Sequence, residues 1–192
     1  MYLDDEAIDS IVDRSIFNSR KKKLAYNISL SDSLSSLQRE AVKGALKIIS
    51  ESVSVDFILT DGYFGSDLYI KNSDLPKNVT GMQTEVLGLL EMKSDRDYTE
   101  EGGGGFKTLL HELCHFLGMD HADDPWSLIP IEFRNIGATI EMQHGVPDSQ
   151  PSPFTLRQVD LAVLQSLYGA RSKNRGGILI TYTIIIEEIN SA

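Results

Sequence analysis

The chain has 192 residues, of which 41% are hydrophobic and 24% are charged, a composition typical of one globular domain. With 18 basic and 28 acidic residues, its net charge of −10 argues against nucleic-acid binding, which usually needs a basic face. The single cysteine, Cys114, excludes a disulfide within the chain. No apolar run reaches the ~18 residues of a membrane span. The first residues lack the basic start and the apolar middle of a signal peptide.

The N-terminal half of the sequence predicts helices alternating with strands. Apolar residues at helical spacing predict an amphipathic helix over 4–17. A strand is expected over 23–30. Ser35, with Gln38 three residues later, is a capping box that predicts a helix extending to about residue 50. Two further strands are expected over 53–60 and 67–71, separated by a turn.

The second half predicts fewer strands and a long irregular segment. After a polar loop over 72–81, we expect a strand over 86–93, placed at a sheet edge because it contains Gly88 and is flanked by polar loops. A glycine run then precedes a helix over 106–117. The last helix is expected over 155–168, with Thr155 as its N-cap and Gly169 at its C-terminal end.

The sequence HELCHFLGMDH, which begins at His111, carries the predicted chemistry. Residues four apart on a helix lie one above the other, so His111 and His115 could bind the same ion. Gly118 is expected to end the helix and to turn His121 back toward that ion, since glycine adopts the left-handed conformation. Three imidazoles with one open position are typical of catalytic zinc. Glu112 would flank the metal as the general base for its water.

The same helix has an apolar face opposite its histidines, which is expected to be buried. Cys114, beside this face, is expected to be a small core residue. The alternative interpretation is structural, with three histidines that merely satisfy their hydrogen bonds on a half-buried helix. The apolar face is made by Phe106, Leu109, Leu110, Leu113, Phe116 and Leu117.

The sequence HELCHFLGMDH resembles the signature of metzincin zinc peptidases at every fixed position. The sequence FTLRQVDLAVLQSLYG, over 154–169, is similar to the closing helix of the matrixin and serralysin branch. The resemblance implies an α+β fold with an α/β N-terminal half, a twisted mixed sheet, an active-site helix and a closing C-terminal helix. The catalytic domain is expected over 23–170, where the resemblance lies. Residues 1–22 are expected to be an N-terminal helical and linker segment, and 171–192 a β-rich tail of unknown role that the resemblance does not explain.

The resemblance also implies further site residues. Gly118 and Met142 would support the zinc ligands, Met142 as the methionine of a turn beneath the metal. Serralysins carry a tyrosine two residues after that methionine. Here His144 holds the position and could contact the transition state or be an exposed loop residue. An extended substrate would add to the edge strand along Val86, Leu87, Gly88, Leu89 and Leu90.

The expected function is a zinc-dependent endopeptidase with one catalytic Zn²⁺ ion and with Glu112 as the general base. Its expected partners are protein or peptide substrates, without nucleic acid or a membrane span, and the protein is expected to be a monomer. The family resemblance implies that it is secreted. Ca²⁺ could bind, but no motif indicates it. Two alternatives stay open, namely a catalytically silent peptide-binding module on the same fold and a zinc hydrolase of a non-peptide amide. Whether 1–22 is an inhibitory pro-segment also stays open.

Overall fold

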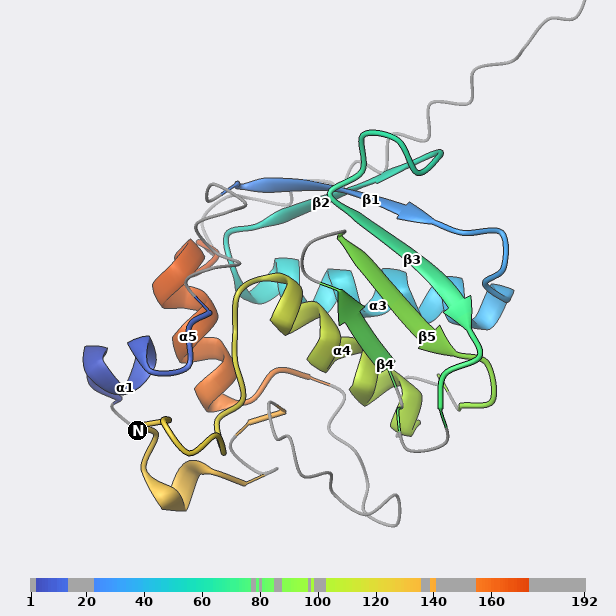
Figure 1. The fold of residues 1–192 in the computed structure, drawn as a ribbon. Coiled ribbons are helices and arrows are strands. Elements are labelled where there is room, and N and C mark those ends of the chain that lie inside the picture. Colours follow the sequence, from blue (N-terminus) through green and yellow to red (C-terminus); the bar gives the residue numbers. More distant parts are fainter. Residues whose placement is uncertain are drawn as a thin grey trace, which may run out of the picture.

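The computed structural model describes residues 3–13, 23–76, 79, 81–84, 88–96, 98, 103–135, 139–140 and 155–172. These residues form an α+β fold of helices and one mixed five-stranded sheet, which confirms the predicted fold class (Figure 1). Within the described ranges, no helix is both long enough and apolar enough to cross a membrane.

The sheet has the strand order β2-β1-β3-β5-β4. In its parallel part, β1 (Ala25–Leu30) lies between β2 (Asp56–Thr60) and β3 (Leu68–Ser73). Next to β3 lies β5 (Leu89–Lys93), which is also parallel to it. The edge strand β4 (Gly81–Thr84) pairs antiparallel with β5. The sheet is therefore parallel except at the edge formed by β4.

The helix α3 (Ser36–Ser52) makes the crossover between the parallel strands β1 and β2. It begins at the predicted capping box, in which the Gln38 backbone N–H donates to Ser35 Oγ at 3.2 Å. In return, the Ser35 N–H donates to Gln38 Oε1 at 2.9 Å. The helix α4 (Gly104–Phe116) lies on the same face of the sheet as α3 (Figure 1).

The core lies between the sheet and these two helices. Side chains alternate between the two faces of a strand, so one residue in two points toward the helices. On β1, Tyr26 and Ile28 are at most 1% exposed, and on β3, Leu68 and Ile70 are fully buried. Burying an aliphatic or aromatic side chain of this kind stabilises a fold by about 1.5–3 kcal/mol.

The N-terminal segment differs from the helix predicted over 4–17. The helix α1 covers only Asp5–Asp9, and the Asp4 side chain caps it by accepting from the Ala7 N–H at 2.8 Å. After α1 the chain is not helical, and Val12 forms an isolated antiparallel bridge with Met119. The prediction was wrong at these residues because pairing with a distant segment replaces the helical hydrogen bonds. Residues 14–17 lie outside the described ranges.

The predicted position of the edge strand was wrong. The strand predicted there, 86–93, corresponds to β5, which lies inside the sheet. The true edge strand, β4, begins at Gly81, in what was predicted to be a loop. A short, polar strand gives no periodic hydrophobic signal. Consequently Leu89 and Leu90 cannot line the open edge, and Gly88 occupies a turn with φ +56°. Val86 and Leu87 are not among the described residues.

The closing helix α5 (Gln158–Tyr168) ends at Gly169, whose φ of +86° matches the predicted glycine stop. Its start is later than predicted. The N-cap is Arg157, not Thr155, and the Arg157 backbone N–H donates to Asp160 Oδ2 at 2.7 Å. The carboxylate of Asp160 thus satisfies a backbone group at the start of α5.

Candidate metal centre

The helix α4 buries one face and presents its histidines on the other. The predicted apolar residues of α4, such as Phe106 and Leu113, are at most 1% exposed, and Cys114 is fully buried. His111 and His115 are only partly buried. The helix ends at Gly118, whose φ of +95° reverses the chain and brings His121 back toward the other two histidines.

The three imidazoles converge through their Nε2 atoms. These atoms lie 3.0 Å apart in His111 and His115, 3.1 Å apart in His115 and His121, and 3.3 Å apart in His111 and His121. Nitrogen ligands at ~2.0–2.1 Å from a tetrahedral zinc ion lie about 3.4 Å from one another. A slight expansion would fit the three atoms to such an ion, and this histidine cluster is a potential metal site.

Backbone carbonyls set the tautomers of two of these rings. Nδ1–H of His111 donates to the Ile140 carbonyl at 3.0 Å, and Nδ1–H of His115 donates to the Met119 carbonyl at 2.8 Å. In a neutral ring, Nε2 then carries a lone pair and no hydrogen. Lone pairs 3.0 Å apart repel each other unless a cation lies between them.

His111 is not protonated at neutral pH and so does not relieve this repulsion. Desolvation, and secondly the neighbouring His115 ring, lower the pKa of His111 to about 3. The ring is therefore neutral near pH 7 and needs to lose no proton to bind a metal. The donor set fits a divalent cation that accepts imidazole nitrogen, and zinc is such an ion.

Glu112 follows the first histidine and lies beneath the edge strand. It is only 8% exposed. A Cβ atom at Gly81 of β4 would lie 3.3 Å from Glu112 Oε1 and 2.6 Å from Thr108 Cγ2. Glycine at this position therefore allows β4 to lie directly against α4. The sequence predicts a loop at Gly81 and therefore gives no sign of this contact.

Asp160 on α5 supports His111 through an intervening peptide group. It is fully buried and accepts hydrogen bonds from Thr139 Oγ1 at 2.6 Å and from the Ile140 N–H at 3.1 Å. The carbonyl of Ile140 in turn accepts from His111. Burial raises the pKa of Asp160 to about 6, although the hydrogen bonds, that from Thr139 first, act in the opposite direction. In the sequence, Asp160 is part of the stretch 154–169 that carries the family resemblance, but that stretch does not reveal its contact with residues 139 and 140.

Tyr168, also on α5, supports the end of α4. Its hydroxyl donates to the Leu117 carbonyl at 2.8 Å and lies 3.2 Å from the Tyr26 hydroxyl. Leu117 immediately precedes Gly118, so this bond fixes the point at which the chain turns toward the third histidine. The closing helix therefore holds two parts of the centre in place.

Two acidic residues surround the third histidine. Asp120 Oδ1 accepts from the His121 backbone N–H at 2.9 Å, and Asp124 Oδ2 lies 3.9 Å from His121 Nδ1. Burial, and secondly the nearby Asp120 carboxylate, raise the pKa of Asp124. Negative charge beside an imidazole favours a cation on its other nitrogen.

The remaining predicted site residues, Met142 and His144, lie outside the described ranges, so the methionine turn and the transition-state contact stay predictions. No family model and no curated protein matches the sequence. The convergence of the three histidines therefore rests on this chain's own geometry.

Proposed function

We propose that the protein is a zinc-dependent endopeptidase of the metzincin type. The observation that supports this most strongly is the placement of Glu112 directly after a histidine whose Nε2 atom converges with two others. Three imidazoles leave one coordination position open, whereas a purely structural zinc site would use four protein ligands. A carboxylate beside an open position is the arrangement that hydrolysis requires.

Glu112 would act as the proton-transfer group. When bound, zinc would supply a Lewis acid that lowers the pKa of a water molecule to about 7 and polarises a carbonyl oxygen. The Glu112 carboxylate would accept the proton of the attacking water and pass it to the leaving amine. Its position between α4 and β4 restricts the side chain, which helps to hold the carboxylate in one orientation.

The substrate would bind as an extended strand on β4. Within the described ranges, β4 pairs with β5 on one side only, so its other side can pair with a peptide backbone. Gly81 of β4 adjoins Glu112, which brings a peptide bound on this edge close to the general base. This assignment replaces the one that the sequence predicted for residues 86–90.

The test compares the full chain with the variant Glu112→Ala. Bound zinc is measured by elemental analysis, and cleavage is measured with a library of quenched fluorescent peptides. Glu40→Ala is a matched control, because Glu40 is an exposed glutamate on α3. We expect one zinc ion in all three proteins and cleavage in all but Glu112→Ala.

Other outcomes would favour the alternatives. One zinc ion with no peptide cleavage by the unmodified chain would favour a silent binding module or a hydrolase of another amide. A panel of non-peptide amides and esters would distinguish these two. Absence of zinc from all three proteins would contradict the proposal.

A further inference from the structure

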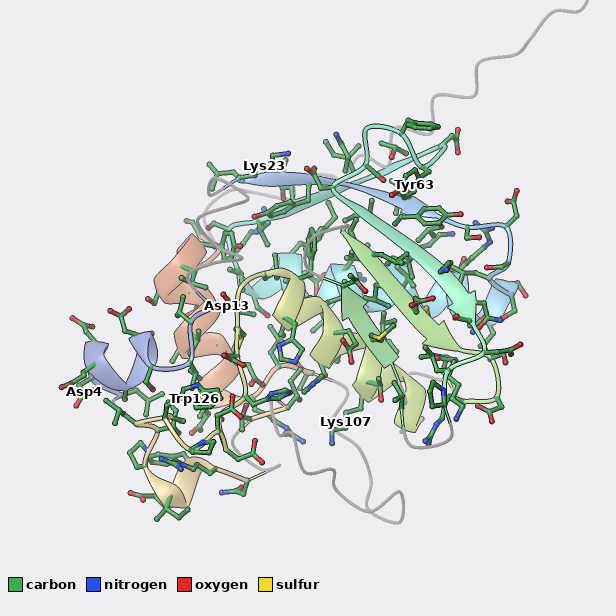
Figure 2. The ribbon with its side chains drawn as sticks, viewed as in Figure 1. Asp4, Asp13, Lys23, Tyr63, Lys107 and Trp126 are labelled. Atoms are coloured by element: carbon green, nitrogen blue, oxygen red, sulfur yellow. The ribbon has the colours of Figure 1, made fainter. Side chains whose placement is uncertain are left out.

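We propose that the N-terminal clamp, defined as residues 10–13, holds the turn that carries His121, so that zinc affinity depends on it. The proposal rests on the metal centre and not on peptidase activity. It implies that this segment is part of the finished site and not a removable inhibitor. Figure 1 shows α1 and the segment that follows it beside the orange α5, and Figure 2 labels Asp13 at the end of this segment.

The clamp binds the backbone just before His121. The Asp13 N–H donates to the Gly118 carbonyl at 2.8 Å, and the Asp120 N–H donates to the Ile11 carbonyl at 2.8 Å. Between these two bonds, Val12 pairs with Met119. Residues 117–120 connect the C-terminal end of α4 to the third histidine. The clamp therefore runs along the only covalent link between the second and third ligands.

The clamp also binds the chain after His121. Ser10 Oγ accepts from the Leu128 N–H at 2.8 Å and donates to the Ala7 carbonyl at 2.7 Å. The hydroxyl thus connects the end of α1 to the loop that follows the third ligand. Because the contacts lie on both sides of His121, the clamp limits how far that residue can move.

The surroundings of the clamp are those of a protein core. Ile11 is fully buried, and Ile8 and Leu3 are at most 9% exposed. Met119, which pairs with the clamp, is also fully buried. A removable pro-segment would cover a surface that is complete without it, whereas loss of this segment would expose apolar side chains next to the ligand turn.

Loss of the clamp is expected to weaken metal binding. Without the clamp, the backbone groups of Gly118 and Asp120 would lose these partners, and the turn would sample more conformations. Zinc would then have to order the turn on binding, which reduces affinity. Changes to groups that orient a metal ligand typically cost about 10- to 100-fold in metal affinity.

The first experiment uses the full chain with Asp13→Pro, which removes the N–H that donates to Gly118. Asp13→Ala is the matched control, since it keeps the N–H and removes only the carboxylate. Zinc affinity is measured by competition with a chelator, and the cobalt-substituted proteins are compared by their visible absorption. We expect Asp13→Pro to bind zinc at least tenfold more weakly and to alter the cobalt spectrum. Asp13→Ala should stay within about threefold of the unmodified chain.

Two results would overturn the proposal. In one, folded Asp13→Pro binds zinc as tightly as the unmodified chain. In the other, Asp13→Ala loses as much affinity as Asp13→Pro, so that the carboxylate and not the backbone bond is responsible. If Asp13→Pro does not fold, Ser10→Ala tests the contact with Leu128, and Ser10→Thr keeps the hydroxyl as its control. Weaker zinc binding by Ser10→Ala, restored in Ser10→Thr, is expected, and unchanged binding by Ser10→Ala would contradict the clamp.

A second experiment addresses removal directly. A recognition sequence for a specific protease is inserted between Arg20 and Lys21 of the full chain, which is then cut after folding. We expect the N-terminal fragment to stay bound during gel filtration and the zinc to be retained. Spontaneous loss of the fragment, with retained zinc or increased peptidase activity, would identify a pro-segment and overturn the proposal. The zinc measurement separates this outcome from a failure of the proposed peptidase function.

Discussion

Two parts of the metal centre are built in different ways. His111 and His115 lie one turn apart on α4, so the helix places their imidazoles next to each other, with the Nε2 atoms 3.0 Å apart. His121 lies beyond the helix, in a turn that depends on Gly118, on the N-terminal clamp and on the nearby acidic side chains. The helix brings the first two ligands together, whereas the position of the third ligand depends on contacts with a segment more than 100 residues away in the chain.

This difference predicts two kinds of mutational effect. Changes in the support of α4 should mainly lower the stability of the fold, because α4 contributes a large part of the core. Changes at the turn should mainly lower zinc affinity, since fewer buried side chains depend on the turn.

Loss of a histidine ligand should lower zinc affinity more than any other change. The loss should be similar for a ligand on α4 and for the ligand in the turn. His115→Ala and His121→Ala are each expected to weaken zinc binding by a factor on the order of a thousand or more, because two imidazoles alone hold the ion poorly. Calorimetric titration with zinc measures the change. Glu40→Ala, an exposed position on α3, serves as a control. Tight binding by either histidine variant would show that the residue is not a ligand.

Replacement of Asp160 should lower stability and zinc affinity together. The Asp160→Asn amide cannot accept from Thr139, Ile140 and Arg157 at once, and each buried donor left without an acceptor costs about 1–3 kcal/mol. We expect the free energy of unfolding in urea to fall by about 3 kcal/mol. Thr139→Ser retains the hydroxyl and should change little. An equal loss of unfolding free energy in Asp160→Asn and Thr139→Ser would mean that altered packing, and not loss of the carboxylate, lowers the stability.

The low pKa of His111 predicts how the metal-free protein responds to acid. Because the folded-state pKa of His111 is about 3 and the unfolded value is near 6.5, its contribution to stability is present above pH 6.5 and is lost as the pH falls toward 3. Between pH 7 and pH 5 the free energy of unfolding of the unmodified protein should fall by about 2 kcal/mol more than that of His111→Gln. Comparing the two proteins cancels the opposite contribution of Asp160, whose folded-state pKa is raised. If the free energies of unfolding of the two proteins, measured by urea denaturation, changed with pH in parallel, the low pKa of His111 would be contradicted.

A methyl group at the edge strand should affect catalysis but not metal binding. Gly81→Ala would bring Cβ within 2.6 Å of Thr108 Cγ2 and 3.1 Å of Glu112 Cγ, so that β4 or Glu112 must move. We expect kcat to fall about tenfold while zinc affinity is unchanged. Adding Thr108→Ser removes the closer contact and should restore part of the activity. Full activity in Gly81→Ala would show that Glu112 is not confined by β4.

Local sequence signals predicted the elements whose causes are local. The capping box of Ser35 and Gln38 and the apolar face of α4 are each determined by residues within a few positions of one another. Local signals gave wrong predictions where contacts with distant segments determine the structure. Gly81 joins the sheet only because β5 and α4 lie beside it, and Val12 leaves the helical conformation only because Met119 pairs with it.

The same distinction applies to the site. The ligand pattern can be read from the spacing of His111, His115 and His121, but nothing in that spacing reveals the groups that orient the rings. The support from Asp160 crosses from α5 to the segment at residue 140, and the support from the clamp comes from the N-terminus. Each is a contact in space between residues whose sequence neighbourhoods are unremarkable.

The most direct measurement is X-ray absorption at the zinc edge on the purified full chain, with His115→Ala beside it. We predict one zinc ion per chain with three imidazole nitrogens at ~2.0–2.1 Å and one further light ligand, and loss of this signal in His115→Ala. A chain without zinc, or a spectrum dominated by sulfur or by carboxylates alone, would contradict a three-histidine centre.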